Sequence, residues 1–179
     1  MSRVLSVSPE EARGPAKELL IAVGGAFGMV PNATRVMAQS PPVLEGFLAL
    51  STALGKVGIG DKLHTQVKLA ASEANACNYC TSILCAVGSQ AGLTAADLLE
   101  GRSARAADAR TNAALKFAAQ VLESRGKVTD EDLRAVRAAG FDDAGVVEIV
   151  ASVVLGCYTN FLNNVAETPL DIPAARPLA

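Results

Sequence analysis

The chain has 179 residues, of which 50% are hydrophobic and 19% charged, with a formal net charge of −2. That is enough for one domain with a substantial core, and the apolar content excludes intrinsic disorder. The near-balanced charge gives no basic surface for nucleic acid or an anionic membrane, so we expect neither as a partner.

Helical periodicity and helix-boundary residues predict nine helices and no strand, which makes the expected fold class all-α. The alanine-rich, aromatic-poor composition agrees with this prediction. The first helix is expected to begin at Pro9 and to end at Gly28, because proline is favoured in a first turn and glycine after a last one. The expected helices cover about 9–27, 31–39, 41–56, 61–76, 79–90, 94–100, 108–124, 129–139 and 142–166.

Two of these helices begin with a recognisable cap. Thr94 with Asp97 three residues later is typical of a capping box, and Thr129 with Asp132 repeats the pattern. The tail beyond residue 166 contains three prolines and cannot be helical. We expect this tail to lie over the surface of a neighbouring subunit.

No targeting or membrane segment is expected. Residues 1–14 contain a proline and two glutamates before any apolar run begins. The longest apolar stretch, 146–155, carries Glu148 and is too short to span a bilayer. We therefore expect a soluble, cytoplasmic protein that forms a single domain over residues 1–179.

A C-x-x-C motif, C-N-Y-C at residues 77–80, is the feature that indicates chemistry. Two thiols at this spacing can close a disulfide, and one of them is often a reactive thiolate. Zinc is disfavoured because a structural site needs four ligands, and the motif supplies two. The other ligands would have to come from Cys85, Cys157 and His64, which do not form a second closely spaced pair. A helix rather than a strand precedes the motif, which argues against a thioredoxin-like fold. We expect neither a metal nor a cofactor.

Residues 64–84, HTQVKLAASEANACNYCTSIL, resemble the core motif of the alkylhydroperoxidase-D-like / carboxymuconolactone decarboxylase superfamily. The sequence AGL at 91–93 fits the same pattern, and CYTNFLNNVAET at 157–168 is similar to the C-terminal helix of its peroxidase-related subgroup. The resemblance runs from about residue 27 to residue 173.

This resemblance implies an all-helical bundle that assembles into a homo-oligomer, a trimer or a hexamer. It also implies reduction of hydroperoxides in antioxidant defence, with the resulting disulfide reduced by a lipoyl-type or other thiol donor. By position, Cys80 corresponds to the thiol that attacks the peroxide and Cys77 to its resolving partner. The predicted geometry agrees, because Cys80 lies in a first helical turn whose dipole favours a thiolate and Cys77 just precedes it.

The chain departs from the family at its proton relay. Members typically have glutamate twelve residues before the first cysteine and histidine four residues after the second, whereas Thr65 and Leu84 occupy these positions here. Leucine cannot accept a proton and threonine is a poor base. Loss of a general base commonly costs roughly 10²–10⁴ in rate, so we expect slow peroxidase turnover or a different role.

Three other side chains are accessory candidates. His64 neighbours Thr65 but points about 100° away on a helix, so a surface or interface position is favoured over a role as a base. Glu73 lies one turn before Cys77 and is either a base or, more simply, a solvated helix charge. Tyr79 either donates a hydrogen bond to a thiolate or substrate, or packs in the core.

The remaining polar and sulfur-containing groups have structural interpretations. Cys85 and Cys157 are expected to be small buried hydrophobes. The amides and hydroxyls of 159–167 fall on one helix face and line either a pocket or a subunit interface, of which the interface is favoured.

Three functions are compatible with these residues. The first is a dithiol oxidoreductase of peroxidase type, attenuated by the missing relay. The second is a lyase like the lactone decarboxylases of the superfamily, against which the intact cysteine pair counts. The third is a non-catalytic or redox-responsive oligomeric binding protein, which loss of both relay residues favours.

Overall fold

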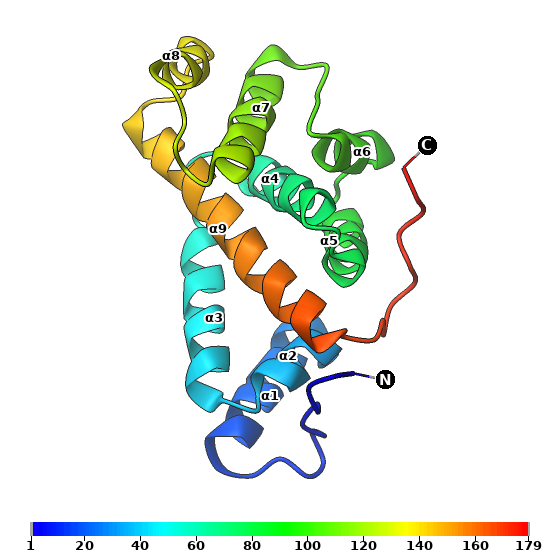
Figure 1. Cartoon of the computed structure of the whole chain (residues 1–179). Coiled ribbons are helices and arrows are strands. Elements are labelled where there is room, and N and C mark those ends of the chain that lie inside the picture. The colour runs from blue at the N-terminus through cyan, green and yellow to red at the C-terminus, as the bar shows by residue number, and fades with distance from the viewer. Residues whose placement is uncertain (1, 179) are drawn as a thin grey trace.

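The computed structural model describes residues 2–178, and the all-α class is confirmed over that range. The chain forms a bundle of helices with both termini on the same side (Figure 1). The helices are α1 Gly14–Phe27, α2 Asn32–Met37, α3 Pro41–Leu54, α4 Asp61–Ala74, α5 Asn78–Gln90, α6 Ala95–Ser103, α7 Ala109–Ser124, α8 Asp130–Ala138 and α9 Asp143–Ala166.

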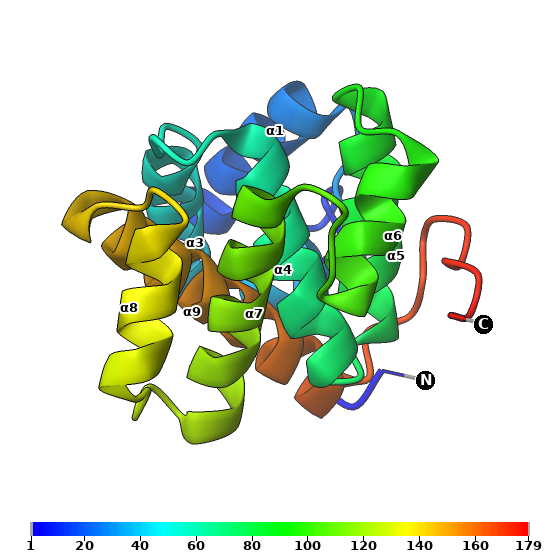
Figure 2. The same cartoon turned by 90° about the horizontal axis from the view of Figure 1, so that it is seen from above.

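Two helices run through the middle of the bundle. Helix α4 packs against α5, α6, α7 and α9, and α9 also contacts α2, α3 and α5. Figure 2 shows α4 enclosed between α5 and α6 on one side and α7 on the other. The cysteine motif therefore follows directly from the central helix of the fold.

The apolar interior consists of two main clusters on either side of this centre. One joins α4, α7, α8 and α9 around Val67, Leu115 and Ile149, all of which are fully buried. The other joins α1, α2 and α3 around Leu20 and Leu44. Burial of such side chains contributes about 1.5–3 kcal/mol each, which stabilises the helix arrangement around the motif.

The first helix begins later than the sequence predicts. Residues 8–12 form a turn in which Ser8 O accepts from Ala12 N at 2.9 Å, and α1 starts at Gly14 with Pro15 in its first turn. A helix from residue 9 would place Pro15 in its interior, where the ring clashes with the preceding turn. The other predicted boundaries differ from the observed ones by three residues or fewer.

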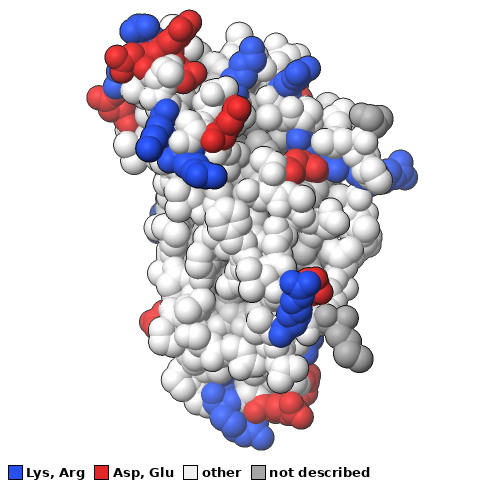
Figure 3. Space-filling view, in the orientation of Figure 1, with Lys and Arg blue, Asp and Glu red and all other residues white. Residues whose placement is uncertain are grey.

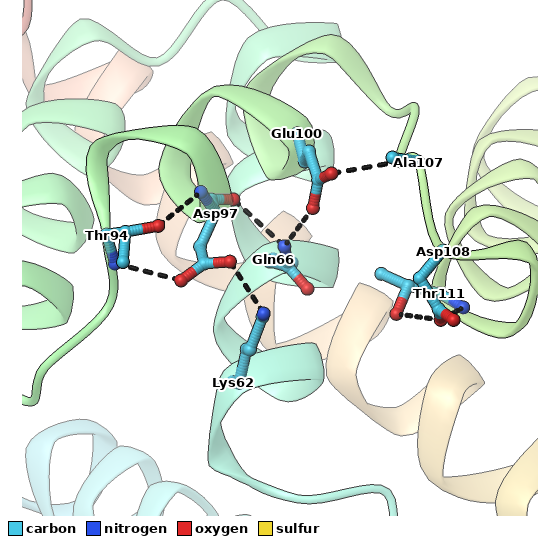
Figure 4. A network of polar contacts seen from close by, with 8 residues as sticks. All are labelled: Lys62, Gln66, Thr94, Asp97, Glu100, Ala107, Asp108 and Thr111. Carbon is cyan, nitrogen blue, oxygen red and sulfur yellow. Dashed lines mark hydrogen bonds and ion pairs between the residues drawn. The ribbon is translucent and has the colours of Figure 1, made fainter.

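Both predicted capping boxes are present, and the one at the start of α6 also contacts α4 (Figure 4). Asp97 closes the box with Thr94 and also forms an ion pair with Lys62 of α4 at 2.6 Å. Gln66 of α4 donates to Asp97 O at 2.9 Å, and Glu100 accepts from Ala107 N at 3.0 Å. These contacts attach α6 to α4 and fix the segment that leads into α7.

The prediction for the C-terminal tail is wrong as to which surface the tail covers. Residues 168–178 run beside α5 and α6 of the same subunit (Figures 1 and 2). Ala175 N donates to Ser82 Oγ at 2.9 Å, and Arg102 donates to Arg176 O at 2.7 Å. The backbone groups of a non-helical tail need partners, and α5 and α6 supply them.

Within residues 2–178, α9 is the one helix long and apolar enough to cross a membrane, with a mean hydropathy of 1.6. It nevertheless buries Ser152, Asn160 and Asn163, all of which form hydrogen bonds inside the domain. One face of α9 is therefore packed inside the domain.

Candidate active site

The cysteine motif lies where α4 ends and α5 begins. Ala76 has a left-handed backbone (φ 50°), and Cys77 N donates to Ser72 O at 2.9 Å, so α4 ends in a Schellman motif. The chain then turns at once into α5, with Cys77 as its N-cap and Cys80 in its first turn. This short connection presents both sulfurs at the N-terminus of α5.

The two cysteines are joined in a disulfide with a Cα–Cα distance of 5.3 Å. Cys77 Sγ also accepts from Cys80 N at 3.2 Å, as an N-cap side chain does. Both residues are buried, with exposed fractions of 1% and 2%. The amide groups of this turn and the positive end of the helix dipole favour a thiolate over a thiol at Cys80 once the disulfide is reduced.

A cavity of about 140 Å³ reaches the pair from one side, and Cys80 but not Cys77 contributes to its wall. Most of the wall is apolar and comes from α1, α2, α3, α5 and α9. Its larger apolar side chains are Phe27, Met37, Phe47, Ile83, Leu84, Val87 and Leu155. A small apolar molecule that enters this cavity meets the sulfur of Cys80.

Asn163 of α9 places a polar group beside the sulfur of Cys80. Its Nδ2 lies 3.4 Å from Cys80 Sγ and donates to Thr159 O at 2.9 Å. Its Oδ1 is buried and has no partner among residues 2–178. An amide donor at this position stabilises negative charge on sulfur, and the free oxygen can accept a hydrogen bond from a molecule in the cavity.

This arrangement corrects the interpretation of the amide-rich face as a subunit interface. Asn163 lies at the dithiol, and Asn160 lies inside the subunit, where it accepts from Asn75 at 3.0 Å and donates to Ser72 at 3.1 Å. Buried amides need such partners, and α4 supplies them within the same chain.

The hydroxyl of Tyr79 is turned toward the tail. It donates to Asp171 Oδ1 at 3.0 Å and accepts from Ala33 N, while Asp171 Oδ2 accepts from Asn32 N at 2.5 Å. Burial, with the Asp171 charge adding to it, raises the pKa of Tyr79 well above its usual value. Tyr79 therefore stays protonated and connects α5 to α2 and to the tail, with its ring at the cavity wall.

Neither relay position carries an ionisable group. Leu84 contributes to the cavity wall, and the methyl group of Thr65 faces Gly88. Glu73 is directed away, because it forms an ion pair with Arg102 at 2.5 Å on the side of α5 that the tail covers. The cavity thus lacks both the carboxylate and the imidazole of the family pattern.

The other two cysteines are half-buried and carry free thiols. Burial raises the pKa of the Cys85 thiol, which favours its unreactive form. Cys157 packs against the cluster of α4, α7, α8 and α9, and its sulfur accepts from Asn75 at 3.5 Å. Neither sulfur is bonded to another cysteine.

The surface position expected for His64 is wrong, because this side chain is only 6% exposed. Its Nδ1 lies 2.7 Å from Ser152 Oγ, and its Nε2 lies 3.5 Å from Nζ of Lys68. Burial, followed by the Lys68 charge, lowers the pKa of His64 to about 4, so the ring is neutral at pH 7. His64 does not itself contribute to the cavity wall, but Lys68 does.

Lys68 was not among the sequence-based candidates. The available signal was its position, four residues after His64 and on the same face of the helix, where two side chains meet. A lysine on an amphipathic helix is usually a solvated charge, so this signal is weak. Across residues 2–178, no group of three or more His, Cys, Asp or Glu side chains is placed to hold a metal ion.

Residues 41–124 match the model of the carboxymuconolactone decarboxylase family. The fold is similar to that of a peroxidase-related protein with the alkylhydroperoxidase AhpD core from Ralstonia eutropha JMP134, with 24% identity, 95% of this chain and 93% of that chain covered, and a TM-score of 0.79. A peroxidase-related protein from Silicibacter sp. TM1040 matches with 20% identity, coverage of 96% and 91%, and a TM-score of 0.77.

A third similar structure is a cysteine-to-alanine variant of the debrominase Bmp8 in complex with 2,3,4-tribromopyrrole. It has 16% identity, coverage of 96% of this chain and 92% of that chain, and a TM-score of 0.81. No curated protein matches this chain.

Proposed function

We propose that this chain, of which residues 41–124 match the carboxymuconolactone decarboxylase family, is a dithiol oxidoreductase of the alkylhydroperoxidase-D-like type that reduces hydroperoxides. The observation that carries the proposal is the position of Cys80. Its sulfur belongs to a Cys77–Cys80 pair, lies in a first helical turn, receives an amide N–H from Asn163 and forms part of a small apolar cavity.

The reaction begins with the reduced pair. The Cys80 thiolate attacks the terminal oxygen of the hydroperoxide, so that an S–O bond forms, the O–O bond breaks and an alkoxide leaves. The sulfenic acid on Cys80 then condenses with the Cys77 thiol, which forms the disulfide and releases water. A thiol donor, lipoyl-type or other, reduces the disulfide and closes the cycle.

The apolar wall selects the substrate class. A cavity of about 140 Å³ lined by apolar side chains favours small organic hydroperoxides over hydrogen peroxide, because their apolar part is removed from water on binding. The missing carboxylate and imidazole predict turnover that is slow compared with a complete relay, by roughly 10²–10⁴.

Stopped-flow oxidation of the fully reduced protein by hydrogen peroxide and by a small organic hydroperoxide tests this function, with free thiols counted before and after. We expect two thiols per chain to be lost faster than free cysteine reacts, and Cys80→Ser to abolish this loss. Cys77→Ser should react once and stop at the sulfenic acid. Cys85→Ser is the matched control, because it removes a cysteine outside the pair.

Oxidation no faster than that of free cysteine would contradict a peroxidase and would leave a redox-responsive binding protein as the better proposal. Turnover of a lactone or related acid by the Cys77→Ser/Cys80→Ser double variant would instead support a lyase.

A second candidate is reductive dehalogenation by the same dithiol. The similarity to a debrominase and the apolar, relay-free cavity favour it. The Cys80 thiolate would take the halogen, the ring carbon would take a proton, and Cys77 would displace halide to form the disulfide. Release of bromide from a bromopyrrole in step with thiol loss, without a comparable reaction with hydroperoxide, would favour this candidate.

We also propose that the protein is a cytoplasmic homo-oligomer assembled through the outer face of α9. Val147, Val154 and Phe161 are spaced seven residues apart on this helix and are 66%, 54% and 57% exposed. Charged side chains lie mainly at the two ends of the molecule in Figure 3, and the middle of the face that α9 crosses is nearly free of them. Light scattering should give a trimer or hexamer, and Phe161→Glu should lower the mass.

A further inference from the structure

The cavity beside Cys80 holds one cation that has no carboxylate partner. Lys68 of α4 contributes to its wall, and among residues 2–178 it forms no ion pair with an aspartate or glutamate. The other side chains of the wall are apolar or neutral. A buried charge without a counterion is costly, so an anion that forms inside the cavity has a ready partner in Lys68.

A chain of hydrogen bonds holds Lys68 in place. Ser152 Oγ donates to Glu148 O at 2.7 Å, which leaves its lone pairs to accept from His64 Nδ1 at 2.7 Å. The proton on Nδ1 leaves Nε2 as an acceptor, and Nζ of Lys68 lies 3.5 Å from it. The order of donors and acceptors is therefore fixed from the backbone of α9 to the ammonium group at the cavity.

We propose that Lys68 is the proton-handling residue of the dithiol, in place of the missing carboxylate and imidazole, and that His64 and Ser152 are its positioning residues. The ammonium group pairs with the Cys80 thiolate when the disulfide is reduced. It then gives its proton to the alkoxide that leaves when the thiolate attacks a hydroperoxide. This role deepens the proposed function and rests on it.

The step balances over one cycle. Reduction of the disulfide yields two thiols, and the proton of the Cys80 thiol passes to the Lys68 amine, which gives a thiolate and an ammonium. Attack on the hydroperoxide converts the thiolate to a sulfenic acid, and the ammonium protonates the alkoxide to an alcohol. Condensation with the Cys77 thiol forms the disulfide and water, and the amine is ready for the next proton.

The proton affinity of Lys68 suits this exchange. Burial lowers the pKa of Lys68 to about 8, close to the pKa of an ordinary thiol. A group whose pKa lies near the operating pH can both accept and release a proton at useful rates. An exposed lysine, by contrast, holds its proton too tightly to serve as an efficient donor at neutral pH.

Few other titratable groups face Lys68. His64 lies one turn before it on α4, and α5 contributes Tyr79 and Cys80 to the same wall. Helices α1, α2, α3 and α9 contribute no charged side chain to the wall. His64 is neutral at pH 7 and Tyr79 stays protonated, so Lys68 is the group available to exchange a proton with Cys80.

The test measures the pKa of Cys80 in the fully reduced protein without any peroxide. Site-resolved alkylation by iodoacetamide as a function of pH gives the midpoint for wild type, Lys68→Met, Lys68→Arg and Lys62→Met. We expect Lys68→Met to raise the Cys80 midpoint by about one to two pH units, because a nearby opposite charge is lost. Lys68→Arg keeps the charge and should restore most of the shift.

Lys62→Met is the matched control, since it removes an exposed charge from the same helix outside the cavity and should leave the midpoint unchanged. A midpoint unaltered in Lys68→Met would overturn the pairing of Lys68 with Cys80. Because the measurement uses no peroxide, this result is independent of whether the protein is a peroxidase.

Proton donation is tested by single-turnover oxidation with an organic hydroperoxide at a pH where Cys80 is fully ionised. Arginine keeps its proton at any accessible pH, so Lys68→Arg should react about ten- to a hundredfold more slowly than wild type despite an intact thiolate. A wild-type rate in Lys68→Arg would overturn the proton-donating role. A slower single-turnover oxidation in Lys68→Arg, with the pH midpoint of Cys80 alkylation unchanged, would support the proton-donating role.

Discussion

The crossing of α4 and α9 depends on one glycine. A Cβ atom added at Gly156 would lie 2.9 Å from the Cβ of Ala71 and 3.6 Å from the Cα of Lys68. Non-bonded contacts of a Cβ atom below 3.0 Å are essentially never seen in proteins, so Gly156→Ala must push the two helices apart. Because α4 carries Lys68 and α9 carries Asn163, this displacement would also widen the cavity at Cys80.

Two effects of opposite sign determine the stability of this variant. Overpacking of a core contact costs about 1–3 kcal/mol, whereas glycine to alanine in a helix gains about 1 kcal/mol. Gly156→Ala alone should therefore destabilise the protein by roughly 0–2 kcal/mol. Ala71→Gly alone should cost about 1.5–2 kcal/mol, because it lowers helix propensity and removes a buried methyl group.

The double variant separates the two effects. With glycine at position 71 the clash is gone, so Gly156→Ala should now stabilise the protein by about 1 kcal/mol. Urea unfolding of the wild type, both single variants and the double variant gives the coupling free energy, which we expect to be about 1–3 kcal/mol in favour of the double variant. If Gly156→Ala has the same effect on stability in both backgrounds, the close contact does not limit the crossing of the helices.

Three further predictions concern stability. His64 has a pKa of about 4 in the folded state and near 6.5 in the unfolded state, so between these pH values the folded state binds fewer protons. The free energy of unfolding should therefore decrease by up to about 3 kcal/mol as the pH falls from 6.5 to 4. His64→Gln should remove this part of the pH dependence. Asp171→Ala leaves the Tyr79 hydroxyl and the Asn32 N–H without their acceptor, which should cost about 2–4 kcal/mol in urea unfolding and make the tail sensitive to protease. Thr129→Ala removes the N-cap of α8 and should cost about 1 kcal/mol in the same unfolding measurement.

Each of these predictions has a contrary outcome. A pH dependence of stability that is the same in His64→Gln and wild type would mean that the imidazole is not the group that titrates. Asp143→Ala breaks an exposed ion pair and removes the first-turn acid of α9, and it should cost less than about 1 kcal/mol. An equally small loss in Asp171→Ala would refute the importance of its two hydrogen bonds. Unchanged stability of Thr129→Ala would mean that the end of α8 does not depend on its cap.

Local sequence patterns predicted the secondary structure well because helix ends are decided by neighbouring residues. Thr94 and Thr129 cap their helices through a partner three residues away, and both capping boxes are present. The first-turn position of Cys80 follows from the same short-range rules, although α5 begins one residue earlier than predicted and takes Cys77 as its N-cap. The start of α1 was wrong because Ser8 and Pro9 imitate a helix start, whereas Pro15 sets the actual one.

The composition of the cavity wall could not be predicted, since it depends on residues far apart in the chain. Asn163 lies 83 positions from Cys80 and meets it only because α9 crosses the start of α5. His64 was expected at the surface or in an interface because it points about 100° away from Thr65 on the helix. Its burial depends on Ser152, which lies 88 positions away on α9.

Short-range patterns are enough to indicate the helical class, the resemblance to the superfamily and the position of the dithiol at a helix start, because each is encoded within a few turns of chain. The tertiary structure alone decided what surrounds the dithiol. In the folded chain, Glu73 forms an ion pair with Arg102, and Tyr79 donates a hydrogen bond to Asp171. The tail packs on its own subunit, and Lys68 lies at the wall of the cavity beside Cys80. The physical reason is that burial and charge pairing depend on which helices pack together, and the crossing of α4 with α9 sets both at this site.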